Sequence, residues 1–374
     1  MQYRILILEN EFGLGGSEKN LFEFISRTDR SRAHIAVCCL KQGGYFKTRL
    51  EEMGVPFYDG LLRHRFDALA FRELDAILQH ERIQLISTFS HPNTVIFSYL
   101  AKLRRRVEAF MVEYHATGHA DGGRLIPRYL LPILRRADAL VAVAQAQKEY
   151  LIRVEGLPRE TIRVIHNGVD ATVYRPGTPG ERSEVRRALG LRDEHLVLMT
   201  VASLKPLKRL DLLVRATAPI LHSHASTRLV LVGDGPERGA LASLARELGI
   251  ADRVVFTGPR DDVADLLRAA DVFVLSSRTE AFPKAVLEAM ATGLPVVATD
   301  VGSVGEMVEK GKSALVVPGE DEQALSAAIR RVVGDADLRS AFGVRGRAIV
   351  DARFRIETMC ASRQALFEEL LRDA

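Results

Sequence analysis

Residues 273–300 read FVLSSRTEAFPKAVLEAMATGLPVVATD and predict a strand, a loop, a helix and a second strand. Residues 272–275 form a short apolar run, which is typical of a strand buried on both faces. Pro283 suits the first helical position, because a backbone N–H there would be unpaired in any residue. Gly293 is a typical residue just after a helix, and a second buried strand should follow at 296–299. This order of elements is typical of a parallel α/β sheet.

Two carboxylates lie on either side of the expected helix start. Glu280 ends the loop before the helix, and Glu288 lies inside the helix. In a parallel sheet, such a helix begins at the edge where ligands bind, and its free N–H groups favour an anion such as a diphosphate. The two carboxylates could then accept hydrogen bonds from sugar hydroxyls. A plainer alternative is that Glu288 pairs with Lys284 one turn away and that Glu280 is an ordinary loop acid.

A wider pattern resembles the signature of the retaining glycosyltransferases of group 1: Glu280, seven residues, Glu288, and then AMATGLPVVATDVGS. That family has the GT-B fold, in which two Rossmann-like, doubly wound parallel-sheet domains face each other across a cleft. The resemblance implies that Glu280 lies beside the donor sugar and that Glu288 holds the ribose of the nucleotide. It also assigns to the donor site the residues between them, Ala281, Phe282, Pro283 and Lys284. Typical members carry Gly at the position of Ala281, so backbone freedom is lost here.

Length and composition indicate a soluble protein with room for two α/β domains. The chain has 374 residues, of which 47% are hydrophobic and 27% are charged. It contains no apolar run of about 18 residues, and its N-terminus, MQYRILILEN, resembles a first strand more than a signal peptide. The three cysteines show neither disulfide nor zinc spacing, which favours a reducing cytoplasm.

The net charge of +4 lies in the N-terminal half. Residues 1–170 hold 24 Lys and Arg against 20 Asp and Glu, whereas residues 171–374 hold 28 of each kind. The excess would suit an anionic acceptor or peripheral contact with the inner face of an anionic membrane, and a solvated basic face is the plain alternative. Nucleic acid is not expected as a partner, because no basic stretch is interleaved with aromatic residues.

The rest of the chain also alternates strands and helices, which predicts doubly wound parallel sheets. A segment rich in Pro, Gly and charge, YRPGTPGERSE at 174–184, is expected to link two domains. The expected division is an N-terminal, acceptor-side domain at 1–172, a linker at 173–194 and a nucleotide-sugar domain at 195–355. The resemblance implies that the final helix, at 356–374, crosses back to the N-terminal domain.

A glycine-rich loop follows the first expected strand. Its glycines would let the backbone approach a ligand, and Ser17 could cap the following helix. The loop is not a dinucleotide fingerprint, because Glu18 stands where the third glycine is needed. The segment GGSEKNLFEF, which begins at Gly15 and Gly16, resembles the acceptor-side loop of the family. In the family this loop also faces the donor phosphates, so Gly16 is assigned to both sites.

Histidines follow two of the expected strands. His115 comes at the carboxyl end of the strand at 109–114, where it could bind a sugar hydroxyl or only cap the strand end. The resemblance favours the functional role and assigns His115 to the catalytic group. His91 follows the expected strand that ends at Phe89, and the same argument applies to it with less weight. His119 and Arg124 lie in the loop beyond and would meet an acceptor.

The segment VASLKPLKRLDLL, at 201–213, offers a phosphate contact. Lys208 lies near an expected helix start, where it could act as a point charge. In the family pattern, Gly-Arg-Leu is followed by three variable residues and then Lys. Lys208 matches that Lys, but Ser203 stands where the family has Arg. Lys205 or Arg209 could substitute for that Arg. Further along, Arg260 belongs to a segment that resembles the one that contacts the base.

No metal or cofactor is expected, because no zinc-ligand spacing occurs and Gly311-Lys312-Ser313 lacks the first glycine of a P-loop. The sequence therefore predicts a retaining glycosyltransferase that uses a nucleoside diphosphate sugar, UDP-sugar by family frequency. The acceptor would be a polysaccharide, a glycolipid or a small metabolite. Glu280, His115 and Lys208 are the expected catalytic residues. Two alternatives stay open: a GT-B sugar-nucleotide epimerase, and a degenerate sugar-nucleotide or glycan-binding subunit, which Ser203 favours.

Overall fold

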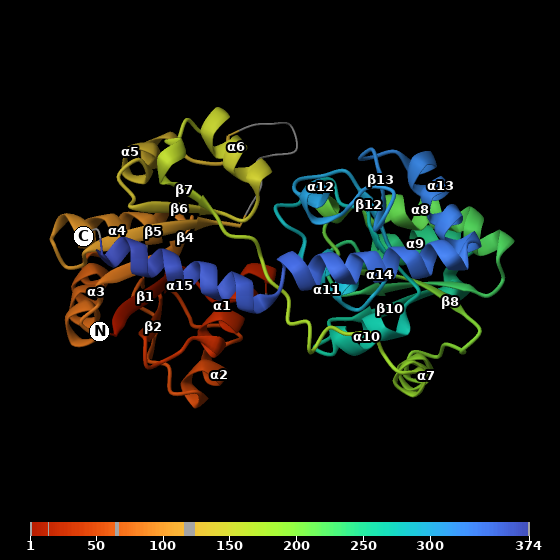
Figure 1. Cartoon of the computed structure of the whole chain (residues 1–374), viewed down its shortest axis with the longest axis horizontal. Helices are drawn as coiled ribbons and strands as arrows, with labels where there is room; N and C mark the ends of the chain where they lie inside the picture. The colour runs from red at the N-terminus through yellow and green to blue at the C-terminus, as the bar shows by residue number, and fades with distance from the viewer. Residues whose placement is uncertain (1, 14, 64–66, 116–123, 373–374) are drawn as a thin grey trace. The chain divides into compact units, whose positions relative to one another are not determined.

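The computed structural model describes residues 2–13, 15–63, 67–115 and 124–372 (Figure 1). The chain forms two compact units. Unit 1 contains Met1–Gly168 together with Ile356–Ala374, and unit 2 contains Val169–Arg355. The last helix, α15 (Ile356–Arg372), therefore packs with the first part of the chain, where it contacts α1 and β1.

Unit 1 is built on a seven-stranded parallel sheet with the strand order β3-β2-β1-β4-β5-β6-β7. Its strands are β1 (Tyr3–Glu9), β2 (Ala33–Cys39), β3 (Phe57–Tyr58), β4 (Leu85–Phe89), β5 (Ala109–Tyr114), β6 (Ala139–Ala142) and β7 (Ile162–Val164). Its other helices are α1 (Gly16–Arg27), α2 (Lys47–Glu52), α3 (Ala68–His80), α4 (Pro92–Leu103), α5 (Leu131–Leu134) and α6 (Gln145–Arg153). The strand order reverses at β1, and sheets of this kind bind ligands at the carboxyl ends of the strands beside the reversal.

Alternation along β1 explains how helices come to cover both faces of this sheet. Ile5 and Ile7 pack in one core cluster with side chains of α1 and α15, including Phe24 and Phe367. Leu6 and its neighbours on the other face join a second cluster with α3 and α4. Because successive side chains of a strand point to opposite faces, an unbroken apolar strand needs a helical layer on each side.

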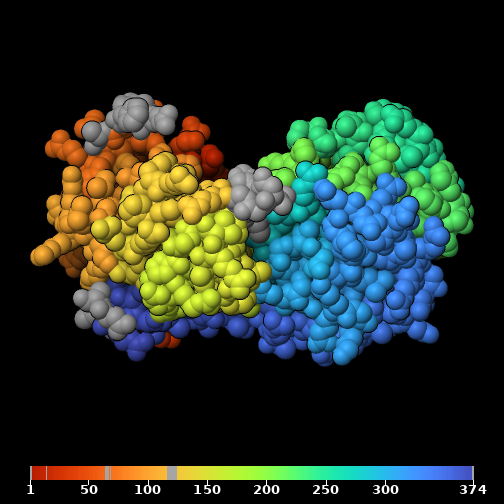
Figure 2. Space-filling view, turned by 90° about the horizontal axis from the view of Figure 1, so that it is seen from above, coloured from red at the N-terminus to blue at the C-terminus, as the bar shows by residue number. Residues whose placement is uncertain are grey.

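Unit 2 is built on a six-stranded parallel sheet with the order β10-β9-β8-β11-β12-β13. Its strands are β8 (Leu196–Val201), β9 (Thr227–Val232), β10 (Val254–Gly258), β11 (Val272–Leu275), β12 (Val296–Thr299) and β13 (Ala314–Val317). Its helices are α7 (Pro179–Ala188), α8 (Leu210–Ser223), α9 (Arg238–Glu247), α10 (Val263–Ala269), α11 (Lys284–Ala291), α12 (Val304–Met307), α13 (Glu322–Gly334) and α14 (Ala336–Arg353). The order reverses between β8 and β11. In Figure 2 the earlier and the later parts of this unit appear as adjoining green and blue surfaces.

The prediction of two Rossmann-like parallel-sheet domains is confirmed. Within 273–300 the observed elements are β11, α11 and β12, and Gly293 has φ +80° just after α11, as expected of a residue that ends a helix. Pro283 differs from its prediction by one position: it is the N-cap of α11, and the helix begins at Lys284. Strand β3 was not predicted, because two residues carry no periodicity.

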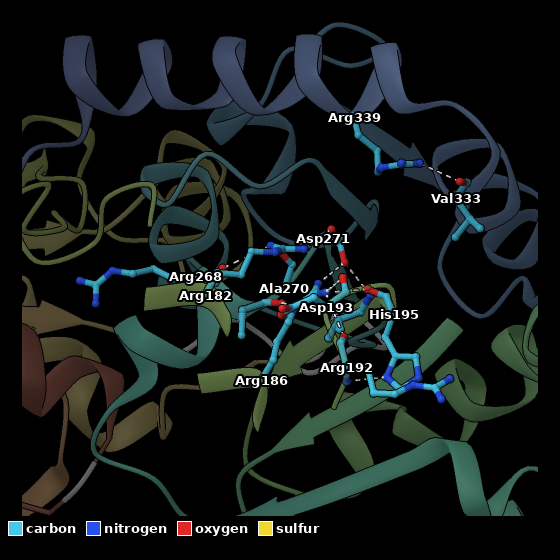
Figure 3. Close-up of polar contacts among 12 residues, drawn as sticks. Arg182, Arg186, Arg192, Asp193, His195, Arg268, Ala270, Asp271, Val333 and Arg339 are labelled. Carbon is cyan, nitrogen blue, oxygen red and sulfur yellow. Dashed lines mark hydrogen bonds and ion pairs between the residues drawn. The ribbon is translucent and has the colours of Figure 1, made fainter. Parts of the chain in front are cut away.

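The segment expected as a linker contains helix α7, which belongs to unit 2 and packs against α10. Its arginines Arg182 and Arg186 converge on Asp271, at the amino end of β11 (Figure 3). The buried Arg186 also donates to the backbone oxygens of Ala269, at 3.0 Å, and His195, at 2.8 Å. Because charged side chains are rarely buried without such partners, this network holds α7 firmly to the sheet.

Among the described residues, no helix combines the length and the apolarity that crossing a membrane requires.

Candidate functional site

The carboxyl edge of the unit 2 sheet brings Lys208 and Glu280 together. Lys208 ends a short 3₁₀ turn after β8, and Glu280 lies in the loop after β11, the neighbouring strand. Lys208 Nζ lies 2.6 Å from Glu280 Oε1, and Ser277 Oγ donates to the same oxygen at 2.7 Å. The two side chains are 26% and 11% exposed, so the pair is reachable from solvent but partly shielded from it. An ammonium and a carboxylate therefore share one point on the edge where α/β sheets bind ligands.

Backbone contacts fix the distance between the two loops. Ser276 Oγ donates to the backbone oxygen of Lys208 at 2.9 Å. The backbone N–H of Arg278 donates to the oxygen of Leu207 at 2.8 Å. Because both loops are tied on either side of the ion pair, the pair does not depend on the flexible lysine side chain alone.

The end of β12 and the loop that follows it support the loop that carries Glu280. Thr299 Oγ1 donates to the oxygen of Ser277 at 2.8 Å, and Ser303 Oγ donates to the oxygen of Ala281. Gly302 has φ +54°, and a Cβ at this position would lie 1.6 Å from the oxygen of Glu280. Only glycine fits so close an approach in this conformation. These residues belong to the family signature, but their role as supports of Glu280 was not predicted from the sequence.

Helix α11 carries the second acidic residue of the motif. Glu288 and Lys284 are buried in this helix, at 5% and 8% exposure. Phe282 is also buried, and its ring contacts that of Phe354, with centroids 5.6 Å apart. Phe282 therefore anchors the helix start in the core, and any contact it makes with an anion would come from its backbone. The first turn of α11 points its N–H groups and its positive dipole end toward the carboxyl edge of the sheet.

Ser203 is exposed in the loop after β8, and its hydroxyl brings no charge to the site. Of the two basic residues that could substitute for the missing Arg, Arg209 is engaged elsewhere. Its guanidinium contacts Asp211 at 3.0 Å and Glu320 at 2.7 Å, and its backbone is left-handed, with φ +46°. Lys205 is exposed in the same loop as Ser203 and is the better candidate for the missing charge.

Arg260 follows β10, the edge strand of unit 2, and β9 and β8 separate that strand from β11. Its Nε atom donates to Asp262 Oδ1 at 2.7 Å. The structure thus places Arg260 on the carboxyl edge of the sheet, away from the Lys208–Glu280 pair along the strand order.

In unit 1, the glycine-rich loop leads directly into α1. Gly15 is the N-cap of this helix, and Gly16 is its first residue. The expectation that Ser17 caps the helix is wrong: its hydroxyl donates to the Glu18 side chain at 2.7 Å. A Cβ at Gly15 would lie 2.2 Å from Glu18 Oε2, so Gly15 lets that side chain fold back over the helix start.

His115 follows β5 at the carboxyl edge of the unit 1 sheet, as predicted. Its Nε2 lies 3.3 Å from Glu113 Oε2, and its ring packs on Phe89, with centroids 4.5 Å apart. His91 is the N-cap of α4, where its Nδ1 accepts from the N–H of Asn93 at 3.4 Å. Burial, together with the charge of Lys41, lowers the pKa of His91. His91 is therefore suited to a neutral, helix-capping role.

Arg124 is exposed, and His119 lies outside the described residues. Within the described ranges, no group of three or more His, Cys, Asp or Glu side chains is arranged to hold a metal ion.

Two family models match the chain. Residues 181–349 match the model described as glycosyl transferases group 1, and residues 14–173 match the model described as glycosyltransferase family 4. The two matches correspond closely to the parts of units 2 and 1 that carry the sites described above.

Among curated proteins, the N-acetyl-alpha-D-glucosaminyl L-malate synthase of Bacillus anthracis is 30% identical over 243 residues, which is 64% of this chain and 62% of that protein. The D-inositol 3-phosphate glycosyltransferase of Acidothermus cellulolyticus is 37% identical over 234 residues, which is 59% of this chain and 51% of that protein. The chain thus spans about half to three fifths of the length of these relatives. Among solved structures, Anabaena HepE in complex with UDP-glucose has a TM-score of 0.83 and 25% identity, over 99% of this chain and 100% of that one.

Proposed function

The chain belongs to the group 1 glycosyltransferase family, and we propose on this basis that it is a retaining glycosyltransferase. It would move a sugar from a nucleoside diphosphate sugar to an acceptor hydroxyl. The single observation that best supports the proposal is the Lys208–Glu280 pair, held at 2.6 Å on the carboxyl edge of unit 2. The pair offers a carboxylate to sugar hydroxyls and an ammonium to the phosphates that join the sugar to the nucleoside.

We assign each residue of this edge a role that suits its position. Glu280 would accept hydrogen bonds from the transferred sugar, and Glu288 from the ribose. Lys208 and the N–H groups at the start of α11 would bind the diphosphate. Negative charge grows on the diphosphate as the sugar leaves, so fixed donors there stabilise the transition state more than the ground state. Because Ser203 stands where the family has Arg, one charge is missing from this set, and Lys205 would supply it.

Glu280 lies on the donor side and already binds Lys208 and Ser277, so it is poorly suited to be a nucleophile. We therefore favour a mechanism in which the acceptor hydroxyl attacks the anomeric carbon from the side of the leaving group. The leaving phosphate then accepts the proton of that hydroxyl. In unit 1, His115, His91, Gly15, Gly16 and Arg124 would serve the acceptor.

The relatives favour a particular donor and a particular class of acceptor for this chain. HepE was solved with UDP-glucose, which favours a UDP-sugar as donor. The two curated relatives are named for L-malate and inositol 3-phosphate. Both are small and anionic, and the excess of basic residues in the N-terminal half suits an anionic acceptor.

A donor panel tests the proposal. Thermal shift and nucleotide release would be measured with several nucleoside diphosphate sugars for the wild type, Lys208→Met, Glu288→Ala and Arg175→Met. Arg175 is the control, because it forms an ion pair of the same 2.6 Å length with Glu181 at the start of α7. With the wild type and the Arg175→Met control, one donor should raise the melting temperature and be slowly hydrolysed. With Lys208→Met and Glu288→Ala, the same donor should do neither.

Two results would overturn the proposal. If no donor shifts the melting temperature, a glycan-binding subunit becomes the better description. If a donor is converted into another sugar nucleotide without an acceptor, the chain is an epimerase.

A further inference from the structure

A buried charge cluster lies at the carboxyl edge of the unit 1 sheet, next to His115. Glu113, the fifth residue of β5, is 1% exposed, and Arg363 of α15 is 3% exposed. Arg363 Nη2 donates to Glu113 Oε2, across 250 positions of sequence. Ser87 Oγ donates to the other oxygen, Oε1, at 2.8 Å. The C-terminal helix thus places a buried cation against the sheet that the first part of the chain forms.

Two buried carboxyl groups at this edge, those of Glu113 and Glu9, have pKa values shifted in opposite directions. Burial by itself would raise the pKa of Glu113, but the Arg363 charge and the hydrogen bonds from His115 and Ser87 outweigh it and lower this pKa. Burial raises the pKa of Glu9 well above its ordinary value, opposed by the N–H of Phe89 and assisted by the charge of Glu113. The negative charge is therefore favoured on Glu113 rather than on Glu9.

An ionised Glu113 determines which nitrogen of His115 carries the proton. A carboxylate can only accept hydrogen bonds, and His115 Nε2 lies 3.3 Å from Glu113 Oε2. Nε2 must then be the N–H, and in a neutral imidazole Nδ1 is left as an acceptor. The ring has little freedom to turn away, because it packs on Phe89 and its side chain is 12% exposed.

We propose that Arg363, acting through Glu113, is a positioning residue for His115. It keeps Glu113 ionised, so that His115 holds its proton on Nε2 and presents Nδ1 as the acceptor for a substrate hydroxyl. This inference rests on the proposed function, because it deepens the role of the acceptor-side histidine. In this form His115 accepts a hydrogen bond from the substrate hydroxyl at Nδ1 and does not donate one to it.

A purely structural role explains the cluster less well. A buried ion pair contributes little net stability, since desolvation offsets most of the attraction. Arg363 also keeps two buried donors, Nε and Nη1, without a hydrogen-bond partner among the described residues, which a pair selected for stability alone would not favour. Its guanidinium rests over the ring of Phe24, 4.9 Å from the centroid, and this contact aims Nη2 at Glu113.

The test reads the tautomer of His115 directly by long-range ¹H–¹⁵N NMR of the full chain with labelled histidine. The His115 signals would be assigned by their loss in His115→Asn. We expect the Nε2–H form in the wild type. In Glu113→Leu no acceptor is left for the Nε2–H group, because Arg363 and His115 both contact Glu113 Oε2, so a fraction of His115 should shift to the Nδ1–H form. In Arg363→Lys the charge remains, and the Nε2–H form should persist.

Glu81→Leu is the matched control, because Glu81 is also buried and lies 2.7 Å from His34 Nε2 at the opposite edge of the same sheet. It should leave the tautomer of His115 and the activity unchanged. Glu113→Leu should lower kcat by about ten- to a hundredfold, with less change in the donor KM. A His115 that stays wholly in the Nε2–H form in Glu113→Leu, or a loss of kcat equal to that of Glu81→Leu, would overturn the inference.

If Glu113→Leu does not fold, the Arg363 variants decide. Arg363→Met should lose the Nε2–H form that Arg363→Lys keeps, and identical spectra for these two variants would also overturn the inference. A tautomer change in a protein that shows no donor response would count against the proposed function and in favour of the positioning role.

Discussion

Gly302→Ala tests whether the loop after β12 positions Glu280. The new Cβ would lie 1.6 Å from the oxygen of Glu280, whereas real Cβ contacts are essentially never shorter than 3.0 Å. The loop that carries Glu280 must therefore move by about 1.4 Å, the difference between these two distances. The left-handed φ of +54° adds strain of roughly 1–2 kcal/mol for a residue with a side chain, and relief of the clash adds about 1–3 kcal/mol.

These terms predict a loss of about 3 kcal/mol in the free energy of unfolding, which corresponds to a melting temperature roughly 6–12 °C lower for a unit of this size. A displacement of this size at a reacting centre should also lower kcat/KM by about a hundredfold. Thermal unfolding and nucleotide release would measure the two effects.

Gly305→Ala is the matched control, because it lies in the following helix and its Cβ would meet its nearest neighbour at 3.7 Å, an ordinary contact. It should retain both stability and activity. If Gly302→Ala behaves like Gly305→Ala, the support assigned to this loop is wrong.

Three further predictions follow from side chains of unit 2. Lys208→Met should lower kcat by about 10²–10³-fold with little change in melting temperature, because its charge acts on the leaving group; a kcat within threefold of the wild type would contradict this role. Arg186→Met should cost about 3–5 kcal/mol in urea unfolding, because it leaves buried backbone oxygens without their donor and removes one of the two arginines that contact Asp271; a loss below 1 kcal/mol would show that the network is dispensable. Glu181 has a pKa lowered to about 2, mainly by hydrogen bonds from Arg175 and from the backbone of Thr178. A lowered pKa contributes stability above the unfolded value of about 4.5, so the advantage of the wild type over Glu181→Gln should be full above that pH and should disappear toward pH 2; unfolding curves at several pH values would reveal it.

Much of the fold could be predicted, because its strands are buried on both faces and leave continuous apolar runs. The strands at 109–114, 272–275 and 296–299 were predicted with the observed bounds. Helix α7 was missed, although its start carries a signal. Thr178 and Glu181 form a capping box with Pro179 as the first helical residue, and the Pro and Gly content of the segment suggested a linker instead.

The site could be predicted less completely, because its supports come from distant parts of the chain. The spacing of Glu280 and Glu288 identifies the donor edge, but nothing local shows that Gly302 packs on the backbone of Glu280. The pairing of Glu113 with Arg363 joins β5 to the last helix, and no periodic pattern reports a contact across 250 positions. Side-chain periodicity gives the face of an element, whereas such pairs depend on how the elements are packed together.

The central claim is that Glu280 binds the transferred sugar while Lys208 binds the diphosphate. Titration calorimetry with UDP and with a UDP-sugar, on the wild type, Glu280→Gln and Lys208→Met, separates the two roles. We predict that Glu280→Gln binds UDP as the wild type does but binds the UDP-sugar about tenfold more weakly, the loss expected for about 1.4 kcal/mol of hydrogen bonding to a charged group. Lys208→Met should weaken both ligands. Equal weakening of UDP and UDP-sugar by Glu280→Gln would contradict the account.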